Sequence, residues 1–200
     1  DENIKRHIYN LTKVFGLNTV VAINRHNDDS EEDVNMLYNL CKNEGVDVQI
    51  AEAYARGGEG CIDLAKAVIK LTDMPHKFSP AYSLDMSITE KIESIAKKVY
   101  GASSVEYSDL AKEKIDIADK LGFANFFVNV AKTQFSFSDN KKLLGAPKDF
   151  VFRITDIEIR SGAKMIVAIA GSMLLMPGLG KKSNYLNMTI DNEGHIEGLF

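Results

Sequence analysis

Three glycines follow an aromatic residue within the stretch YARGGEGC, residues 54–61. An apolar run precedes this stretch and a helical pattern follows it, and a glycine-rich turn between a strand and a helix commonly binds phosphate. The stretch lacks the Gly-Lys-Ser/Thr of a Walker loop, so it offers no lysine to β- and γ-phosphates and no hydroxyl to magnesium. It does not have GxGxxG spacing either, so it matches neither of these two phosphate-binding motifs.

Two interpretations of these glycines remain open. In the first, they only let the backbone turn tightly into the following helix, as glycine commonly does at such junctions. In the second, Gly57 and Gly58 bring the backbone close to a ligand beside Tyr54, and Arg56 and Glu59 contribute charge at the rim. The second interpretation makes the aromatic residue a marker for a flat ligand.

A second candidate is the long polar segment AKTQFSFSDNKKLLGAP, residues 131–147, which follows a strand-like run. Loops at the edge of a scaffold often carry binding groups, although most are simply solvated. Lys132, Thr133 and Gln134 open the segment and are candidate site-lining residues. The four histidines are scattered and none stands beside an obvious serine or cysteine nucleophile, so the catalytic residues stay unassigned.

The elements around the first candidate alternate between strand and helix. Residues 18–26 and 46–54 are apolar runs typical of buried strands, whereas residues 28–45 and 61–73 have apolar side chains at helical spacing. This order predicts a parallel sheet with helices packed on it, whose ligands bind beyond the carboxyl ends of the strands. The stretch NRHND, which begins at Asn24, and the stretch YARGGEG both fall at that edge.

The second half of the chain begins after a connector with two prolines, residues 74–85. Amphipathic helices are predicted over 87–102 and 108–122, a buried strand over 125–133, and two more strand-like runs on either side of the residues RSGAK. We expect an α/β fold of two small units with mainly parallel sheets. The predicted division lies near residue 98 and gives domains 1–98 and 99–200.

Bulk composition narrows the function classes. The chain has 200 residues and a formal net charge of −4, with a pI near 5.6, which argues against a general nucleic-acid binder. Its two cysteines, Cys41 and Cys61, cannot form a disulfide framework and lack the spacing of a zinc site, so we expect no metal site and a reducing, cytoplasmic setting. No apolar run approaches the roughly 20 residues of a membrane helix. The chain opens with DENIKRHIYN and no methionine, so we expect it to be part of a longer protein.

Several segments together resemble the formate–tetrahydrofolate ligase family, also called formyltetrahydrofolate synthetase. They occur in that family's order and at about its spacing: VVAINR, GGEG, KIESIAKKVYGA, VAKTQFSFSDNKKLLGAPKDF, MPGL and the terminal GLF. The likeness covers essentially all 200 residues and corresponds to the carboxyl-terminal portion of the enzyme. AKTQFSFSD and MPGL are its most specific elements.

The resemblance implies an ATP-dependent ligase of one-carbon metabolism. Such an enzyme phosphorylates formate to formyl phosphate, and N10 of tetrahydrofolate attacks the activated carbonyl to give 10-formyltetrahydrofolate, ADP and phosphate. ATP with magnesium binds mainly to an amino-terminal P-loop domain that these residues lack, so we expect this chain alone to be inactive. Family enzymes are often homo-oligomers activated by a monovalent cation, and tetrahydrofolate, formate and ATP are the implied partners.

The resemblance also assigns roles to residues. It implies that Tyr54 stacks on the pterin ring, with flat support from the positions of Asn27 and Ile50. An aromatic face with mostly apolar walls is what a pocket for a flat heterocycle uses.

Some positions depart from the family pattern. Tryptophan is usual at the position of Tyr54, proline at that of Asn27 and glycine at that of Cys61. Leu-Pro is familiar where Phe126 and Phe127 stand, and proline is expected at position 180, where this chain has glycine.

Two hypotheses from different classes follow. The chain is the folate-binding part of an active ligase, or it belongs to a catalytically degenerate relative kept for assembly or regulation. The departures near the folate site favour the second slightly, and the intact AKTQFSFSD segment favours the first. An unrelated nucleotide-binding regulator would explain the alternating elements but not the late motifs.

Overall fold

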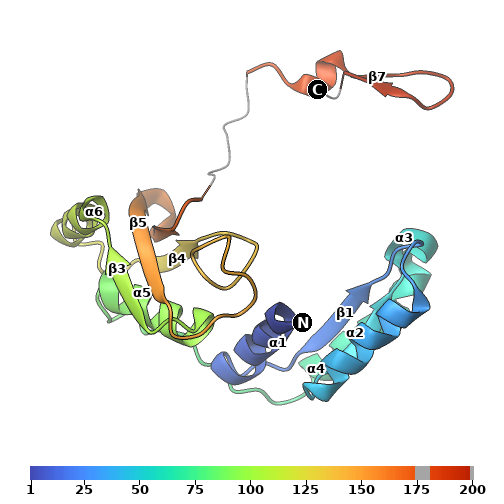
Figure 1. Ribbon diagram of the computed structural model, residues 1–200, viewed down its shortest axis with the longest axis horizontal. Helices are drawn as coiled ribbons and strands as arrows, with labels where there is room; N and C mark the ends of the chain where they lie inside the picture. Colours follow the sequence, from blue (N-terminus) through green and yellow to red (C-terminus); the bar gives the residue numbers. More distant parts are fainter. Residues whose placement is uncertain (174–180, 199–200) are drawn as a thin grey trace.

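The computed structural model describes residues 1–173 and 181–198 and is a mixed α/β structure with parallel strand pairs. Figure 1 shows the helices and strands of residues 1–173 as two arms. The elements of the first arm are α1 (Glu2–Tyr9), the π-helical turn η1 (Asn10–Val14), β1 (Val20–Asn24), α2 (Glu31–Asn43), β2 (Asp47–Ala51), α3 (Ala53–Arg56), the 3-10 turn η2 (Gly57–Cys61) and α4 (Ile62–Thr72).

The sheet of the first unit has two parallel strands. β1 and β2 pair in register from Val20 opposite Asp47 to Asn24 opposite Ala51. Their apolar residues meet the inner faces of α1 and α2 in one buried cluster: Ile8, Ile23, Val34, Cys41, Val46 and Val48. The predicted parallel arrangement of the first half is confirmed.

Local sequence explains where α2 begins and ends. The Ser30 hydroxyl accepts a hydrogen bond from the Asp33 N–H, and the acidic first turn of α2 suits the positive end of the helix dipole. Gly45 follows the helix with a φ of +79°, a conformation that favours glycine and turns the chain into β2.

The second unit contains α5 (Ile88–Ile95), the π-helical turn η3 (Ala96–Tyr100), β3 (Ser104–Tyr107), α6 (Asp109–Lys120), β4 (Phe127–Ala131), β5 (Val151–Arg160), the 3-10 turn η4 (Ser161–Ala163) and β6 (Met165–Ala170). Its sheet has the order β3-β5-β6-β4. The outer pairs, β3 with β5 and β4 with β6, are parallel, whereas the central pair β5 and β6 is antiparallel. Two of the three strand pairs are therefore parallel, which agrees with the predicted mainly parallel sheet, and the hairpin across RSGAK supplies the antiparallel pair.

Helix α5 belongs to the core of the second sheet. Ile88, Ile92 and Ala96 are fully buried in one cluster with Phe152, Ile154 and other residues of β5 and β6. The predicted boundary near residue 98 stays a prediction.

The described residues 181–198 contain a 3-10 turn, η5 (Asn184–Asn187), and a two-residue hairpin of β7 (Thr189–Ile190) and β8 (Ile196–Glu197). The MPGL motif, the glycine at position 180 and the last two residues of GLF lie outside the described residues.

Several elements were not predicted from the sequence, among them α1 in the opening stretch, α3 after β2, and β3 between the two predicted helices 87–102 and 108–122. None of the helices in residues 1–173 and 181–198 combines the length and the apolar character that crossing a bilayer requires.

Candidate functional site

Tyr54 projects from the first unit just beyond the carboxyl end of β2. The sequence placed it at the end of a strand, but β2 ends at Ala51, and Tyr54 lies in the helical turn α3. The residue is 77% exposed. Its aromatic face is therefore open, at the sheet edge where ligands of parallel sheets bind.

A second ring faces the same region from β1. His26 follows the carboxyl end of β1, and its ring centroid lies 6.1 Å from that of Tyr54 with an angle of 37° between the planes. The loop holds the backbone at this residue, because the backbone N–H of His26 donates to Asp29 Oδ2 at 2.7 Å. His26 Nε2 lies 3.4 Å from Asn24 Nδ2. Sequence reasoning counted His26 among the scattered surface histidines, although the stretch NRHND at a strand end was the signal that could have found it.

Ion pairs connect the residues that follow β1 with those that follow β2. Arg25 contacts Glu31 at 2.5 Å and Glu52 at 3.7 Å, and Glu52 also pairs with Arg56 at 3.0 Å. Each pair is at least partly exposed and contributes little alone, but together they link the end of β1 to α3. The charge of Arg56, predicted for the rim of the site, is already partnered by Glu52.

The glycines of the turn have separate roles. Gly57 has a φ of +56°, which favours glycine, whereas a Cβ at Gly60 would lie 2.5 Å from the Glu52 carbonyl oxygen. The Glu52 N–H donates to the Gly60 carbonyl at 3.1 Å, so the turn closes on the end of β2. Gly58 has open space around it. The geometry supports the first interpretation for Gly57 and Gly60 and leaves the second open for Gly58.

A cavity of about 390 Å³ lies on the free side of β2. Ile50, Arg56 and Glu59 line it together with Arg25 and Gly60, and Tyr54 is not among its lining residues. The structure thus separates the predicted site into two groups. Ile50, Arg56 and Glu59 face the cavity, whereas Asn24, His26 and Tyr54 lie at the exposed edge.

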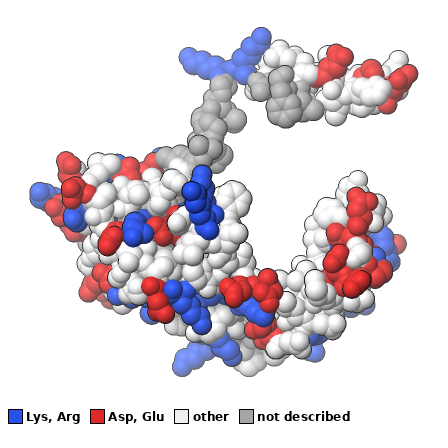
Figure 2. Space-filling view, in the orientation of Figure 1, with Lys and Arg blue, Asp and Glu red and all other residues white. Residues whose placement is uncertain are grey.

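Asn27 lies in the exposed turn after His26, in a strongly acidic neighbourhood. The residues that follow it are DDSEED, and Figure 2 shows acidic side chains gathered on the visible face of this arm. Negative charge repels phosphate, which agrees with the absence of a Walker loop from this stretch. Within the part of the chain that the structure describes, no cluster of three or more His, Cys, Asp or Glu residues is placed to hold a metal ion.

The polar loop after β4 is folded on itself. Lys132 Nζ donates to the carbonyls of Thr133, at 2.6 Å, and Ser136, and it lies 5.3 Å from the centre of the Tyr100 ring. Burial lowers the pKa of Lys132, and the nearby Asp139 carboxylate opposes this shift. Ser138 is fully buried, with its hydroxyl contacting the carbonyls of Asn140 and Leu143. Much of the polarity of this segment therefore serves its own fold.

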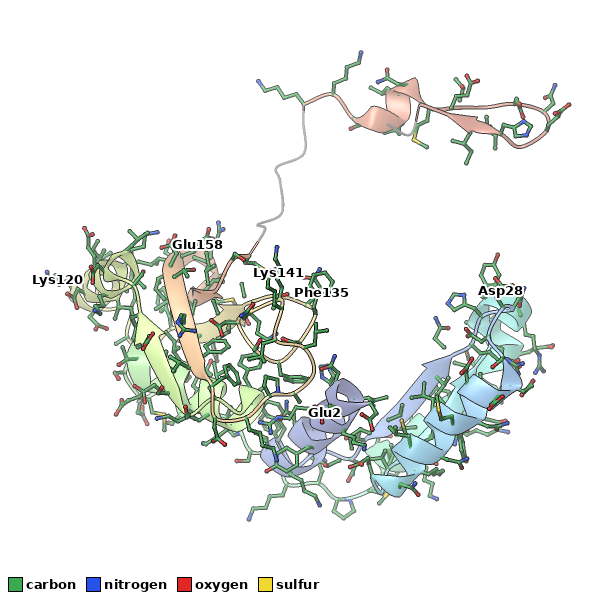
Figure 3. The ribbon with its side chains drawn as sticks, in the orientation of Figure 1. Glu2, Asp28, Lys120, Phe135, Lys141 and Glu158 are labelled. Carbon is green, nitrogen blue, oxygen red and sulfur yellow. The ribbon has the colours of Figure 1, made fainter. Side chains whose placement is uncertain are left out.

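The three predicted residues of this loop are placed differently. Thr133 is buried, Lys132 is partly buried and Gln134 is exposed beside Phe135. Figure 3 shows Phe135 and Asp28, the neighbour of Asn27, on different arms of the molecule. The described residues do not bring this loop to Tyr54, and its part in a ligand site stays a prediction.

The chain is similar to known proteins along its whole length. A family model described as "Formate--tetrahydrofolate ligase" matches residues 1–200. The chain is 42% identical over 198 residues to the formate–tetrahydrofolate ligase of Campylobacter concisus (strain 13826), covering 99% of this chain and 36% of that protein. It is 44% identical over 197 residues to that of Petrotoga mobilis, covering 98% and 35%, and 45% identical over 199 residues to that of Pseudothermotoga lettingae, covering 100% and 36%.

The chain spans little more than a third of the length of these relatives and corresponds to their carboxyl-terminal portion. The match extends through both structural units, so it does not rest on the glycine turn alone. On these grounds the chain belongs to the formate–tetrahydrofolate ligase family.

Proposed function

We propose that the protein containing this chain joins formate to tetrahydrofolate at the expense of ATP, and that this chain supplies a wall of the folate site. Formate takes the γ-phosphoryl group of ATP to give formyl phosphate. N10 of tetrahydrofolate then attacks the formyl carbon, the bond from that carbon to the phosphate oxygen breaks, and 10-formyltetrahydrofolate and phosphate are released. The family name and the match along the chain support this reaction.

The open ring of Tyr54 is the observation that carries the proposal. A ring that is 77% exposed has a face free for a planar ligand, and pterin is planar and aromatic. His26 stands 6.1 Å away at an angle, so it does not cover that face by parallel stacking. Asn24 adds an amide that can hydrogen-bond to the edge of a heterocycle.

ATP and magnesium bind mainly on a P-loop domain outside this chain, under this proposal. The glycine turn lacks the residues that contact phosphate, and its surroundings are acidic. The proposal further includes a cytoplasmic enzyme, a homo-oligomer and a monovalent cation, all taken from the family. The family match supports these features, and the free cysteines Cys41 and Cys61 agree with a reducing compartment.

The test is a titration of the full-length protein with tetrahydrofolate. Replacing Tyr54 by alanine removes the stacking surface and is expected to weaken binding by about 1–3 kcal/mol, on the scale of base–aromatic stacking. Tyr54→Phe keeps the ring and is expected to bind nearly as well, and Tyr54→Trp, with a larger face, at least as well.

Tyr185 provides a matched control, since it is also exposed, at 69%, and lies in the carboxyl-terminal segment. Tyr185→Ala is expected to leave folate affinity unchanged. Equal affinities for Tyr54→Ala and the parent protein would remove position 54 from the site.

A degenerate relative with an assembly or regulatory role is the alternative. The polar Asn27 and the smaller ring of Tyr54, where proline and tryptophan are usual, favour it. The sequence upstream of Asp1 discriminates between the two. A Gly-Lys-Ser/Thr loop in that upstream sequence would support an active ligase. Its absence would support the degenerate relative with an assembly or regulatory role.

A further inference from the structure

β1 pairs with β2 on one edge, and the described residues place no strand along its other edge. Arg25 donates its N–H to the Ala51 carbonyl at 2.9 Å, so Arg25 faces β2. Neighbouring residues of a strand present their N–H and C=O groups to opposite edges, and hence Val21 and Ile23 face β2 as well. Val20, Ala22 and Asn24 face the other edge, where the described residues place no third strand.

An apolar surface borders this edge. A cavity of about 530 Å³ beside β1 is lined by Leu11 and Leu17 before the strand, by Val20 and by Val68 and Leu71 of α4. Val68 is 43% exposed. Backbone polar groups and apolar side chains left open side by side are what a sheet edge offers to an additional strand.

The opposite edge of the same sheet is different. Residue 52, just after β2, has its backbone on the edge away from β1, and the Glu52 N–H is already bonded to the Gly60 carbonyl at 3.1 Å. The cavity on that side is lined by Arg25, Arg56 and other charged residues. Charged side chains and a covering turn are features by which proteins protect an edge strand. The edge at β2 is therefore protected against further pairing, whereas the edge at β1 is not.

The parallel pairing of β1 and β2 also indicates that the sheet has further strands. Parallel sheets are buried because their helical crossovers cover the faces, and a typical sheet has about 5–6 strands. The relatives carry nearly two thirds of their length outside the matched region. Figure 1 shows β1 on the side of its arm that faces the other arm, with α2 and α4 on its far side.

We propose that the free edge of β1 binds a parallel β-strand from the part of the full-length protein that precedes these residues, and that the apolar surface around Val68 is covered by the same segment. Parallel pairing is expected because strands joined through helices run parallel in such sheets. The inference concerns the assembly of the sheet and does not depend on what Tyr54 binds.

Hydrogen exchange in the full-length protein, resolved to single amides, tests the pairing. The amides of Ala22 and Asn24 are expected to exchange at least about 100-fold more slowly than the Ile50 amide, which faces the free edge of β2. Exchange of Ala22 and Asn24 as fast as that of Ile50, with Val21 and Ile23 protected, would overturn the proposal. Protection that disappears on dilution to the monomer would also overturn it, because a second copy would then be the occupant.

A pair of substitutions tests the apolar surface. Val68 in α4 and Ile117 in α6 are both β-branched helix residues, exposed by 43% and 42%. In the full-length protein, Val68→Lys is expected to lower the melting temperature by about 4 °C or more relative to Ile117→Lys, since only Val68 would be buried by the added segment. Equal shifts for the two variants would contradict the proposed cover.

Discussion

Single side chains carry the functional account, and Tyr54 is the one on which it depends. Its ring is open and stands beyond the carboxyl end of β2, where a ligand of a parallel sheet is expected. The resemblance named Tyr54, Asn27 and Ile50, but the sequence could not tell that α3 lifts Tyr54 away from the cavity that Ile50 lines. Side-chain direction in a short helix after a strand depends on backbone angles that apolar periodicity does not encode.

A buried charge in the second unit gives a prediction at the same scale. Lys91 is fully buried, and its ammonium group donates to the carbonyls of Ala124, at 2.6 Å, and Phe126, at 3.1 Å. Lys91→Met keeps the unbranched apolar stem of the side chain but removes the terminal ammonium group and leaves both carbonyls without this donor. We expect this substitution to lower the free energy of unfolding, measured by urea denaturation, by about 1–3 kcal/mol.

Lys120 supplies the control for that measurement, since it is exposed at the end of α6. Lys120→Met is expected to change stability by less than about 0.5 kcal/mol. A similar small change for Lys91→Met would show that the buried ammonium group does not hold the 124–126 turn.

Elements with a long apolar face could be predicted from the sequence, whereas short or lightly buried elements could not. Apolar spacing predicted α2, α5 and α6, because each has one face on a core. It also predicted α4, although that helix buries only Ala67. It did not predict β3, whose four residues give too short a pattern, or α1, which buries only Ile8. The antiparallel pairing of β5 with β6 follows from the short connection through RSGAK, since parallel strands need a longer crossover.

Two glycines of the turn after β2 are predicted to differ in their tolerance of alanine. A Cβ at position 60 would lie 2.5 Å from the Glu52 carbonyl oxygen, whereas one at position 58 meets nothing within 4 Å. Gly60→Ala is therefore expected to destabilise the protein by about 1–3 kcal/mol, and Gly58→Ala to change stability by less than about 0.5 kcal/mol. Denaturant midpoints of the two variants measure the difference, and equal values would mean that the turn does not close on β2 as described.

The start of α5 gives a pH prediction. Ser87 and Glu90 form a capping box in which Glu90 accepts from the Ser87 N–H at 2.8 Å. The Ser87 N–H and then the Ser87 hydroxyl lower the pKa of Glu90 below 4.5. A depressed carboxylate pKa stabilises the folded state above the unfolded pKa, and the stabilisation is lost as the pH falls through the folded pKa.

The stability difference between the parent protein and Glu90→Gln is accordingly expected to be constant near neutral pH and to shrink as the pH falls below about 4.5. Urea midpoints at several pH values measure it. Glu113→Gln, at an exposed position on α6, is the control for the loss of a charge alone. A difference for Glu90→Gln that grows on acidification would contradict the capping role.

At the scale of the whole molecule, we propose that the chemistry of this chain needs a further part of the protein. The chain covers 36% of the Campylobacter concisus relative, its glycine turn is not a Walker loop, and its first sheet has two strands among the described residues. We expect the 200-residue chain alone to show no formate-dependent release of ADP, and the full-length protein to show it. Formate-dependent ADP release by the isolated chain would contradict the proposed division of labour.

The contact of a pterin with the phenol ring at position 54 can be observed directly. The full-length protein is labelled with 3-fluorotyrosine, the Tyr54 resonance is assigned with Tyr54→Phe, and tetrahydrofolate is titrated in while the fluorine spectrum is followed. Because a stacked heterocycle changes the magnetic environment of the ring, the Tyr54 signal is expected to shift and saturate with the ligand, while the Tyr185 signal stays in place. A Tyr54 signal that does not move when the protein is saturated with tetrahydrofolate would contradict the account.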